Sequence, residues 1–117
     1  MTDVFSHPWL GGLFHVQSVA AIWSPDRQRA HMLAFEAALT RAFAEVGKIP
    51  NDVADKIAGD IQNYTPDLQS LRDGTGRDGV VVPDLVRQLK SLAGGHADAV
   101  HTGATSQDVI DTALVLT

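Results

Sequence analysis

The stretch from Ser24 to Gly47, SPDRQRAHMLAFEAALTRAFAEVG, carries the clearest helical pattern of this chain and so decides the class of fold. Its first three residues are a helix-start signal. A serine can cap free backbone amides, a proline suits the first helical position, and an aspartate complements the positive helix end. Gly47 is typical of the position just after a helix. The stretch therefore predicts one helix between these two signals.

Apolar residues recur along this predicted helix at helical spacing: Met32, Phe35, Leu39, Phe43 and Val46. Alanines fill the flanks, so the apolar surface is wider than one stripe. We therefore expect other elements to cover this helix on more than one side. Glu36 lies within the apolar surface, and we expect its carboxylate to pair with a nearby arginine or a backbone amide.

Two shorter helices are predicted next along the chain. Pro50 and Asn51 open one, whose narrow apolar row is Val53, Ile57 and Ile61. Thr65-Pro66-Asp67 repeats the order of cap, proline and acid, and begins a short helix that contains Leu68 and Leu71. The following residues 73–79, DGTGRDG, include three glycines and predict a loop.

A further helix is expected from Val82 to Leu92, where apolar residues fit the i, i+3, i+4, i+7 pattern, and Gly94-Gly95 ends it. Asp84 and Arg87 could pair on its exposed face. Alternation typical of a strand is confined to residues 80–82, which are too few to build a sheet. The predicted fold class is all-α.

The residues before Ser24 are irregular and rich in aromatic side chains. We interpret them as an extended arm that packs on the helical body, with a short helix from Gln17 to Trp23. A flexible terminus is the alternative, which the number of aromatic residues disfavours.

Composition excludes several classes of function. The 117 residues make about one small domain, and their net charge of −5, with basic residues scattered singly, argues against a nucleic-acid or polybasic membrane surface. The chain has no cysteine, so disulfides, a thiol nucleophile and thiolate metal sites are excluded. No secretion signal is present, and no apolar run approaches the roughly 20 residues that cross a bilayer. We expect a soluble cytoplasmic protein.

The last residues of the chain, 101–117, read HTGATSQDVIDTALVLT and combine hydroxyls, an imidazole and a glycine turn before a helix. Ser106 is the expected N-cap, with Asp108 in the first turn. Thr105 and Ser106 would present hydroxyls and free amides at the positive helix end, which suits a carboxylate or phosphate. His101 could face the same pocket and add a titratable donor. The alternative is that these hydroxyls only cap the helix.

This last helix has two neighbouring apolar rows, one of Val109, Ala113 and Leu116 and one of Ile110 and Leu114. Two rows imply burial between neighbours, yet a helix of about 12 residues is marginal by itself. We therefore expect the helix to continue in a longer protein; a short docked helix that ends naturally is the alternative. The remaining histidines show no metal-ligand spacing, and we expect no metal.

The motif HTGATSQDVIDT, residues 101–112, resembles the first signature region of the fumarase/aspartase/adenylosuccinate lyase superfamily. Within it, GATSQDVIDTALVL is similar to the family of 3-carboxy-cis,cis-muconate cycloisomerases. The similarity extends to HMLAFEAALTRAFAEVGKIP (31–50), RDGVVVPDLVRQLK (77–90) and FSHPWLGGLF (5–14), and so covers almost the whole chain.

The resemblance implies an all-helical homotetramer built around a long-helix bundle. Residues 1–105 would form an amino-terminal helical domain, and residues 106–117 the start of a truncated bundle helix. It also implies an enzyme without metal or organic cofactor that acts on a small polycarboxylate. In the cycloisomerase, a carboxylate of the muconate attacks its own double bond and closes a lactone.

By the same match, Thr105 and Ser106 would hold a substrate carboxylate, while His101 and Gln107 would line the pocket. Asp108 and Asp111 would orient the loop and cap neighbouring helices. The second and third signatures of the superfamily, which carry the usual proton donor and acceptor, do not occur in these residues. We therefore expect the catalytic acid and base outside residues 1–117, and we expect this chain to be inactive alone.

Two other functions stay open. An adenylosuccinate-lyase-like enzyme would release fumarate from a nucleotide precursor. Such a substrate calls for basic residues near the amino terminus, and residues 2–23 contain no lysine or arginine. A non-catalytic helical assembly module is the other alternative, because buried-type helices left without neighbours would expose apolar surface and self-associate.

Overall fold

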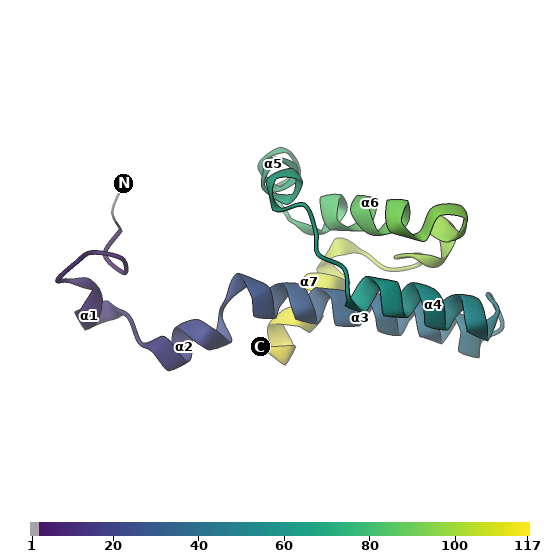
Figure 1. The fold of residues 1–117 in the computed structure, drawn as a ribbon, viewed down its shortest axis with the longest axis horizontal. Coiled ribbons are helices and arrows are strands. Elements are labelled where there is room, and N and C mark those ends of the chain that lie inside the picture. The colour runs from purple at the N-terminus through teal and green to yellow at the C-terminus, as the bar shows by residue number, and fades with distance from the viewer. Residues whose placement is uncertain (1–2) are drawn as a thin grey trace.

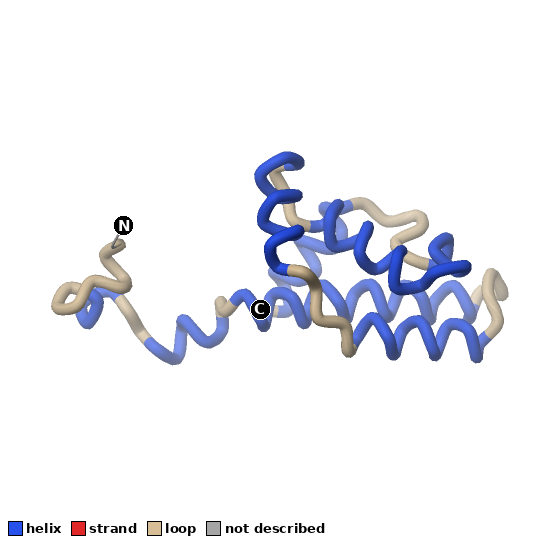
Figure 2. Tube along the Cα trace, turned by 45° about the horizontal axis from the view of Figure 1, so that its top comes forward, coloured by secondary structure: helices blue, strands red, loops and turns tan. Residues whose placement is uncertain are grey.

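The computed structural model of this protein describes residues 3–117, and all regular elements in that range are helices, which confirms the all-α prediction (Figures 1 and 2). In chain order they are α1 (Gly11–Phe14), α2 (Gln17–Ile22), α3 (Pro25–Glu45), α4 (Asn51–Gln62), α5 (Leu68–Asp78), α6 (Val82–Ala93), the 3₁₀ helix η1 (Gly94–Ala99) and α7 (Ser106–Leu116). Within the described range, no helix is both long and apolar enough to cross a membrane.

Both ends of α3 form as the sequence predicts. The Ser24 hydroxyl accepts a hydrogen bond from the Arg27 amide at 3.3 Å, and Pro25 occupies the first helical position. At the other end Gly47 adopts φ +73°, and the amides of Gly47 and Lys48 donate to the last free carbonyls of the helix. This Schellman arrangement ends the helix without leaving those carbonyls unpaired.

Helices α3 and α4 lie side by side, and α6 and α7 pack against them (Figures 1 and 2). The core lies between these four helices. Its fully enclosed large side chains include Ile61 of α4, Val82, Leu85 and Leu89 of α6, Val100 of the segment before α7, and Val109 of α7. Two of the three apolar residues predicted for α4, Ile57 and Ile61, are buried in it.

The buried face of α3 differs from the predicted stripe. Met32 is buried as expected, but Phe35, Leu39 and Phe43 are only half-buried and Val46 is 68% exposed. The face that meets α4 and α7 instead carries Leu33, Glu36, Ala37 and Thr40. Packing on two sides turns the helix so that two polar residues enter the core, where each finds a hydrogen-bond partner.

The predicted loop over residues 73–79 is wrong, because α5 continues through two of its glycines to Asp78. The reason is a close approach of α5 to α6. A Cβ atom on Gly74 would lie 2.5 Å from the Cβ of Asp84, so this glycine admits the neighbouring helix. Gly79, at φ +78°, ends the helix. The cap of α5 is Asp67 rather than Thr65, since Asp67 Oδ1 accepts from the amides of Gln69 and Ser70 at 3.0 Å each.

Asp84 is buried, not exposed as the sequence suggested. It does pair with Arg87, and it also accepts hydrogen bonds from the Ser70 hydroxyl and the Gln88 amide, at 2.9 Å each. The hydrogen bond from Arg87, and then those from Gln88 and Ser70, hold the pKa of Asp84 below its ordinary value. The carboxylate therefore fastens α5 to α6 from inside their contact.

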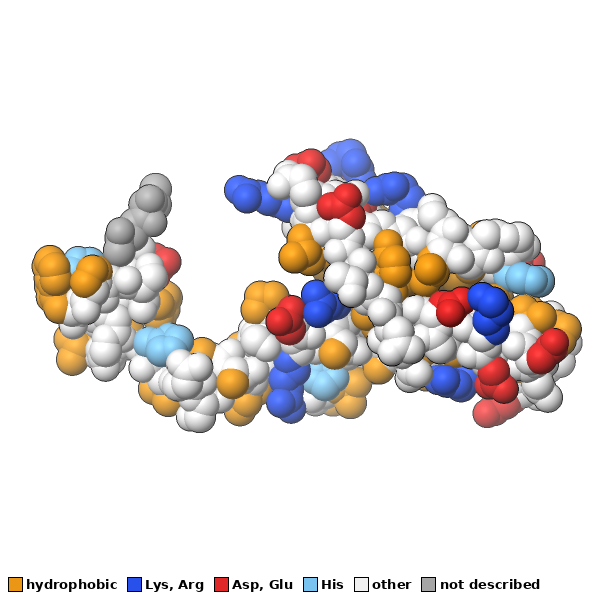
Figure 3. Space-filling view, in the orientation of Figure 1, with side chains coloured by type: hydrophobic (Ala, Val, Ile, Leu, Met, Phe, Trp, Pro, Cys, Tyr) orange, Lys and Arg blue, Asp and Glu red, His pale blue; other side chains and the backbone are white. Residues whose placement is uncertain are grey.

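The amino-terminal arm, which includes α1 and α2, extends away from the body instead of packing on it (Figures 1 and 3). Trp9 and Leu13 are each 76% exposed, and Phe5 and Phe14 are also exposed. The short helix predicted from Gln17 is present as α2, but nothing in residues 25–117 covers these side chains. Met1 and Thr2, the first residues of the predicted arm, lie outside the described range.

Candidate functional site at the amino terminus of α7

The cap of α7 is Thr105, one residue before the predicted Ser106. Thr105 has an extended backbone, its hydroxyl accepts from the Asp108 amide at 3.4 Å, and its own amide donates to Asp108 Oδ2 at 2.7 Å. This reciprocal capping box needs a hydroxyl at the N-cap and an acid three residues later. Asp108 meets that condition for Thr105, which explains the shift from Ser106.

The segment before α7 turns through two left-handed residues. His101 has φ +59° and Gly103 has φ +79°, and the Ala104 amide donates to the His101 carbonyl at 3.4 Å. A non-glycine residue rarely adopts a positive φ, and holding one there costs of order 1–3 kcal/mol. The surrounding contacts of His101 must offset this cost.

Glu36 of α3 provides the main contact of His101. The distance from His101 Nδ1 to Glu36 Oε1 is 2.6 Å, across 65 positions of the sequence. The Glu36 side chain is fully buried and that of His101 is 15% exposed. The sequence analysis assigned Glu36 an arginine or a backbone amide as partner, and the structure corrects this to a histidine.

Thr40, one helical turn after Glu36, makes a second contact with the same segment. Its hydroxyl donates to the Ala99 carbonyl at 3.2 Å in a buried position, and Val100 between the two contacts is fully enclosed. Residues 99–101 are thus held against α3 at consecutive points. The sequence analysis did not identify Thr40. Its position four residues after Glu36, on the same face of the helix, could have indicated that it is buried.

Burial raises the pKa of the Glu36 carboxyl above its ordinary value, because the charged form loses hydration. The hydrogen bond from His101, its charge and the charge of Lys90 act in the opposite direction. Within residues 3–117 the second oxygen, Oε2, is buried without a hydrogen-bond partner. Within the described residues Glu36 is therefore a buried acid with His101 as its one hydrogen-bond partner.

The structure brings only part of the predicted site together. The turn over residues 101–104 joins His101 to Thr105. However, the Thr105 hydroxyl is hydrogen-bonded to Asp108, and His101 Nδ1 is hydrogen-bonded to Glu36. Gln107 is exposed and donates to Asp111 Oδ1 along the same helix. First-turn amides have no partner within their own helix. The amides of Ser106 and Gln107 are thus the groups that could meet an anion.

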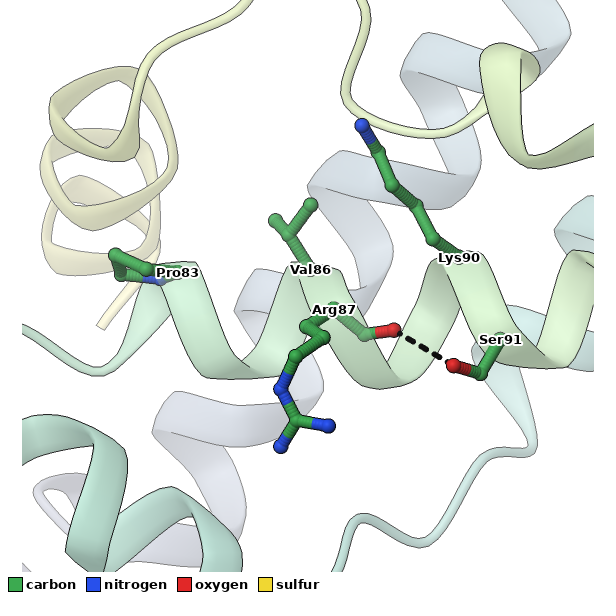
Figure 4. A pocket seen from close by; sticks show the side chains of 5 residues that line it. All are labelled: Pro83, Val86, Arg87, Lys90 and Ser91. Atoms are coloured by element: carbon green, nitrogen blue, oxygen red, sulfur yellow. Dashed lines mark hydrogen bonds between the residues drawn. The ribbon is translucent and has the colours of Figure 1, made fainter.

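Two depressions on the surface are lined by residues other than the predicted site residues His101, Thr105, Ser106 and Gln107. An open one of about 490 Å³ runs along α6 and is lined by Pro83, Val86, Arg87, Lys90 and Ser91 (Figure 4). A smaller one of about 190 Å³ lies between Trp23, α3 and α7. Over residues 3–117, no group of three or more His, Asp or Glu side chains is arranged to hold a metal ion.

Comparisons with known proteins find three informative relatives. The chain is 34% identical over 88% of its length to an N-acetyl-S-(2-succino)cysteine lyase of Enterococcus italicus, and 33% identical over 86% to an adenylosuccinate lyase of Pyrococcus horikoshii. It is 44% identical over 74% to a 3-carboxy-cis,cis-muconate cycloisomerase of Bradyrhizobium diazoefficiens. These matches cover 23%, 22% and 20% of the relatives. The chain thus spans less than a quarter of their length.

Two solved structures share the fold. A fumarate lyase from Mesorhizobium sp. BNC1 superposes with a TM-score of 0.77 and 36% identity over 85% of this chain and 23% of its own. A β-carboxy-cis,cis-muconate cycloisomerase from Acinetobacter calcoaceticus sp. ADP1 gives 0.74 and 34% over 90% and 26%. No family model matches the chain. The relatives and the fold support the fumarase/aspartase superfamily, as an amino-terminal helical part of that fold, without singling out one member.

Proposed function

We propose that this chain is the amino-terminal part of a cofactor-free cycloisomerase that converts 3-carboxy-cis,cis-muconate into a carboxymuconolactone. The observation that carries the proposal is the 44% identity to a cycloisomerase of that substrate, which is higher than the identity to the two lyases described above. The similar structure of a second such cycloisomerase supports it. In this proposal the full protein is a homotetramer.

The chemistry needs a site that holds several negative charges. One substrate carboxylate attacks the double bond, and charge then develops beside another carboxylate until a proton arrives. Fixed donors that face this charge lower the barrier. We place one substrate carboxylate at the amides of Ser106 and Gln107, where the helix dipole adds a favourable field. The Asp108 carboxylate already occupies the Thr105 amide, so the substrate binds beside it.

In the proposed site, His101 supplies a further donor, and the hydroxyls of Thr105 and Ser106 and the Gln107 amide complete the lining. The general acid and base are expected from residues outside this chain, as the missing signatures suggest. The 117 residues alone should therefore bind a polycarboxylate weakly and convert none.

A second candidate is an adenylosuccinate-lyase-like enzyme, which the 33% identity over 86% of the chain supports. The absence of lysine and arginine from residues 2–23 weighs against a phosphorylated substrate. A non-catalytic helical assembly module is the third, and the exposed apolar arm is the feature that favours it.

The test begins with the intact mass of the natural polypeptide, followed by spectrophotometric assays with 3-carboxy-cis,cis-muconate and with adenylosuccinate. We expect a mass well above 12.5 kDa, loss of muconate absorbance and no fumarate from adenylosuccinate. The purified 117-residue chain should give no lactone in the same assay. Lactone formation by that chain, or turnover of adenylosuccinate by the natural protein, would contradict the proposal.

A further inference from the structure

The contact between Glu36 and His101 joins the buried face of α3 to the segment that leads into α7. Glu36 is fully enclosed, and its Oε1 lies 2.6 Å from Nδ1 of His101. The Thr40 hydroxyl holds the Ala99 carbonyl one turn along the same helix. The Glu36 contact thus holds the His101 ring itself, whereas the Thr40 contact holds the backbone two residues before it.

The contact also determines which ring nitrogen of His101 stays available. A neutral imidazole carries its proton on one nitrogen, and a hydrogen bond made by that nitrogen sets the tautomer. Burial raises the pKa of the Glu36 carboxyl, while the hydrogen bond and charge of His101 and then the charge of Lys90 favour its carboxylate form, which can only accept. Nδ1 therefore carries the hydrogen and donates it to Glu36. Nε2 has no partner in residues 3–117 and is not among the enclosed polar atoms.

The position of His101 relative to α7 follows from the turn between them. The Ala104 amide donates to the His101 carbonyl, so the chain folds back on itself within four residues and reaches the N-cap at the next one. The left-handed backbone of His101 and the Gly103 turn keep this connection short. His101, whose side chain is 15% exposed, thus lies four residues before the N-cap of α7 and is joined to it by a single tight turn.

We propose that Glu36 is a positioning residue, which accepts a hydrogen bond from Nδ1 of His101 and so directs Nε2 toward a substrate carboxylate at the amino terminus of α7. The donor role of Nε2 toward that carboxylate belongs to the protonated ring, which the Glu36 carboxylate beside Nδ1 stabilises; in the neutral ring Nε2 can only accept, from a protonated substrate or from water. The contact between Nε2 and a substrate carboxylate rests on the proposed function, whereas the control of the His101 tautomer by Glu36 does not.

The first experiment needs no substrate. The 117-residue chain is labelled with ¹⁵N-histidine, and the His101 ring nitrogens are assigned by comparison with His101→Asn. We expect the Nδ1–H tautomer in the wild-type chain and a mixture of tautomers in Glu36→Leu, because leucine has no atom that could accept from Nδ1. Thr40→Val is the matched control, since it removes the second contact of α3 with this segment and should lower stability without changing the tautomer. An Nε2–H tautomer, or the averaged signals of a free imidazole, would overturn the inference.

The second experiment uses the natural full-length protein and compares wild type with Glu36→Leu, which removes the acceptor of His101 Nδ1, on 3-carboxy-cis,cis-muconate. Misplacing one donor should lower kcat/KM by about 10- to 100-fold, mainly through KM, while circular dichroism stays unchanged. An active wild type with an unaffected variant would refute the positioning role. An inactive wild type would refute the proposed function and, with it, the contact between Nε2 and a substrate carboxylate. The tautomer measurement would still test whether Glu36 sets the tautomer of His101.

Discussion

Thr105 and Asp108 together determine where α7 starts. Each side chain satisfies the backbone amide of the other, and the hydroxyl also donates to the carboxylate at 3.1 Å. Ser106, the next residue, has a hydroxyl of the same kind but lies inside the helix, where its side chain does not cap. The two neighbours therefore allow the capping contribution to be separated from the mere presence of a hydroxyl.

Thr105→Ala should lower the free energy of unfolding by about 1 kcal/mol, because the Asp108 amide loses its acceptor. Ser106→Ala should change it by less than about 0.5 kcal/mol, as expected for a substitution away from a cap. Urea unfolding followed by circular dichroism measures both. If both variants lost the same unfolding free energy, or if Ser106→Ala lost more, Thr105 would not be the cap of α7.

At the scale of elements, the contact between α5 and α6 depends on Gly74. The missing side chain lets the Asp84 side chain approach, and Asp84 in turn binds Ser70 and Gln88. Gly76, two residues later on α5, is exposed and has no neighbouring atom within 4 Å of a Cβ position. One glycine is thus required by packing, and the other is free to change.

Gly74→Ala should destabilise the protein by about 1–3 kcal/mol, since the added methyl forces the two helices apart. Gly76→Ala should stabilise it by up to about 1 kcal/mol, because alanine costs less backbone entropy in a helix. Thermal unfolding of the two variants beside the wild type gives the comparison. A neutral Gly74→Ala would show that α5 does not pack on Asp84 in this way.

The whole molecule is elongated, with principal extents of 56 × 27 × 22 Å, because the arm projects from the helical body. Its exposed side chains include Trp9, Leu13 and Trp23, and Val115 of α7 is 86% exposed. Large apolar side chains that gather on an exposed surface mark interaction sites. The chain therefore carries surface that favours association with other polypeptide.

We expect the 117-residue chain to self-associate, with a sedimentation coefficient that rises with concentration. Replacing Trp9 and Leu13 together by serine should weaken this dependence, because it removes apolar area from the arm. Val46→Ser is the control, since Val46 is 68% exposed but lies at the opposite end of α3. A monomer at every concentration, or an equal effect of the control, would contradict this expectation.

Much of the fold could be predicted from local signals. The start of α3 at Ser24-Pro25, its end at Gly47, the opening of α4 and the extent of α6 all follow from residues within about one helical turn of one another. The similarity of the chain to the fumarase/aspartase superfamily was also visible in its motifs, since the relatives match over most of its length.

The remaining features depend on which helix faces meet, and a local pattern contains no information about that. Glu36 pairs with a histidine 65 positions away, Gly74 serves a contact with Asp84, and the arm leaves the body instead of covering it. Helix boundaries are thus set by hydrogen bonds between near neighbours in the chain. The buried face of α3, the helical path through two glycines of α5 and the orientation of His101 are set by packing between distant segments.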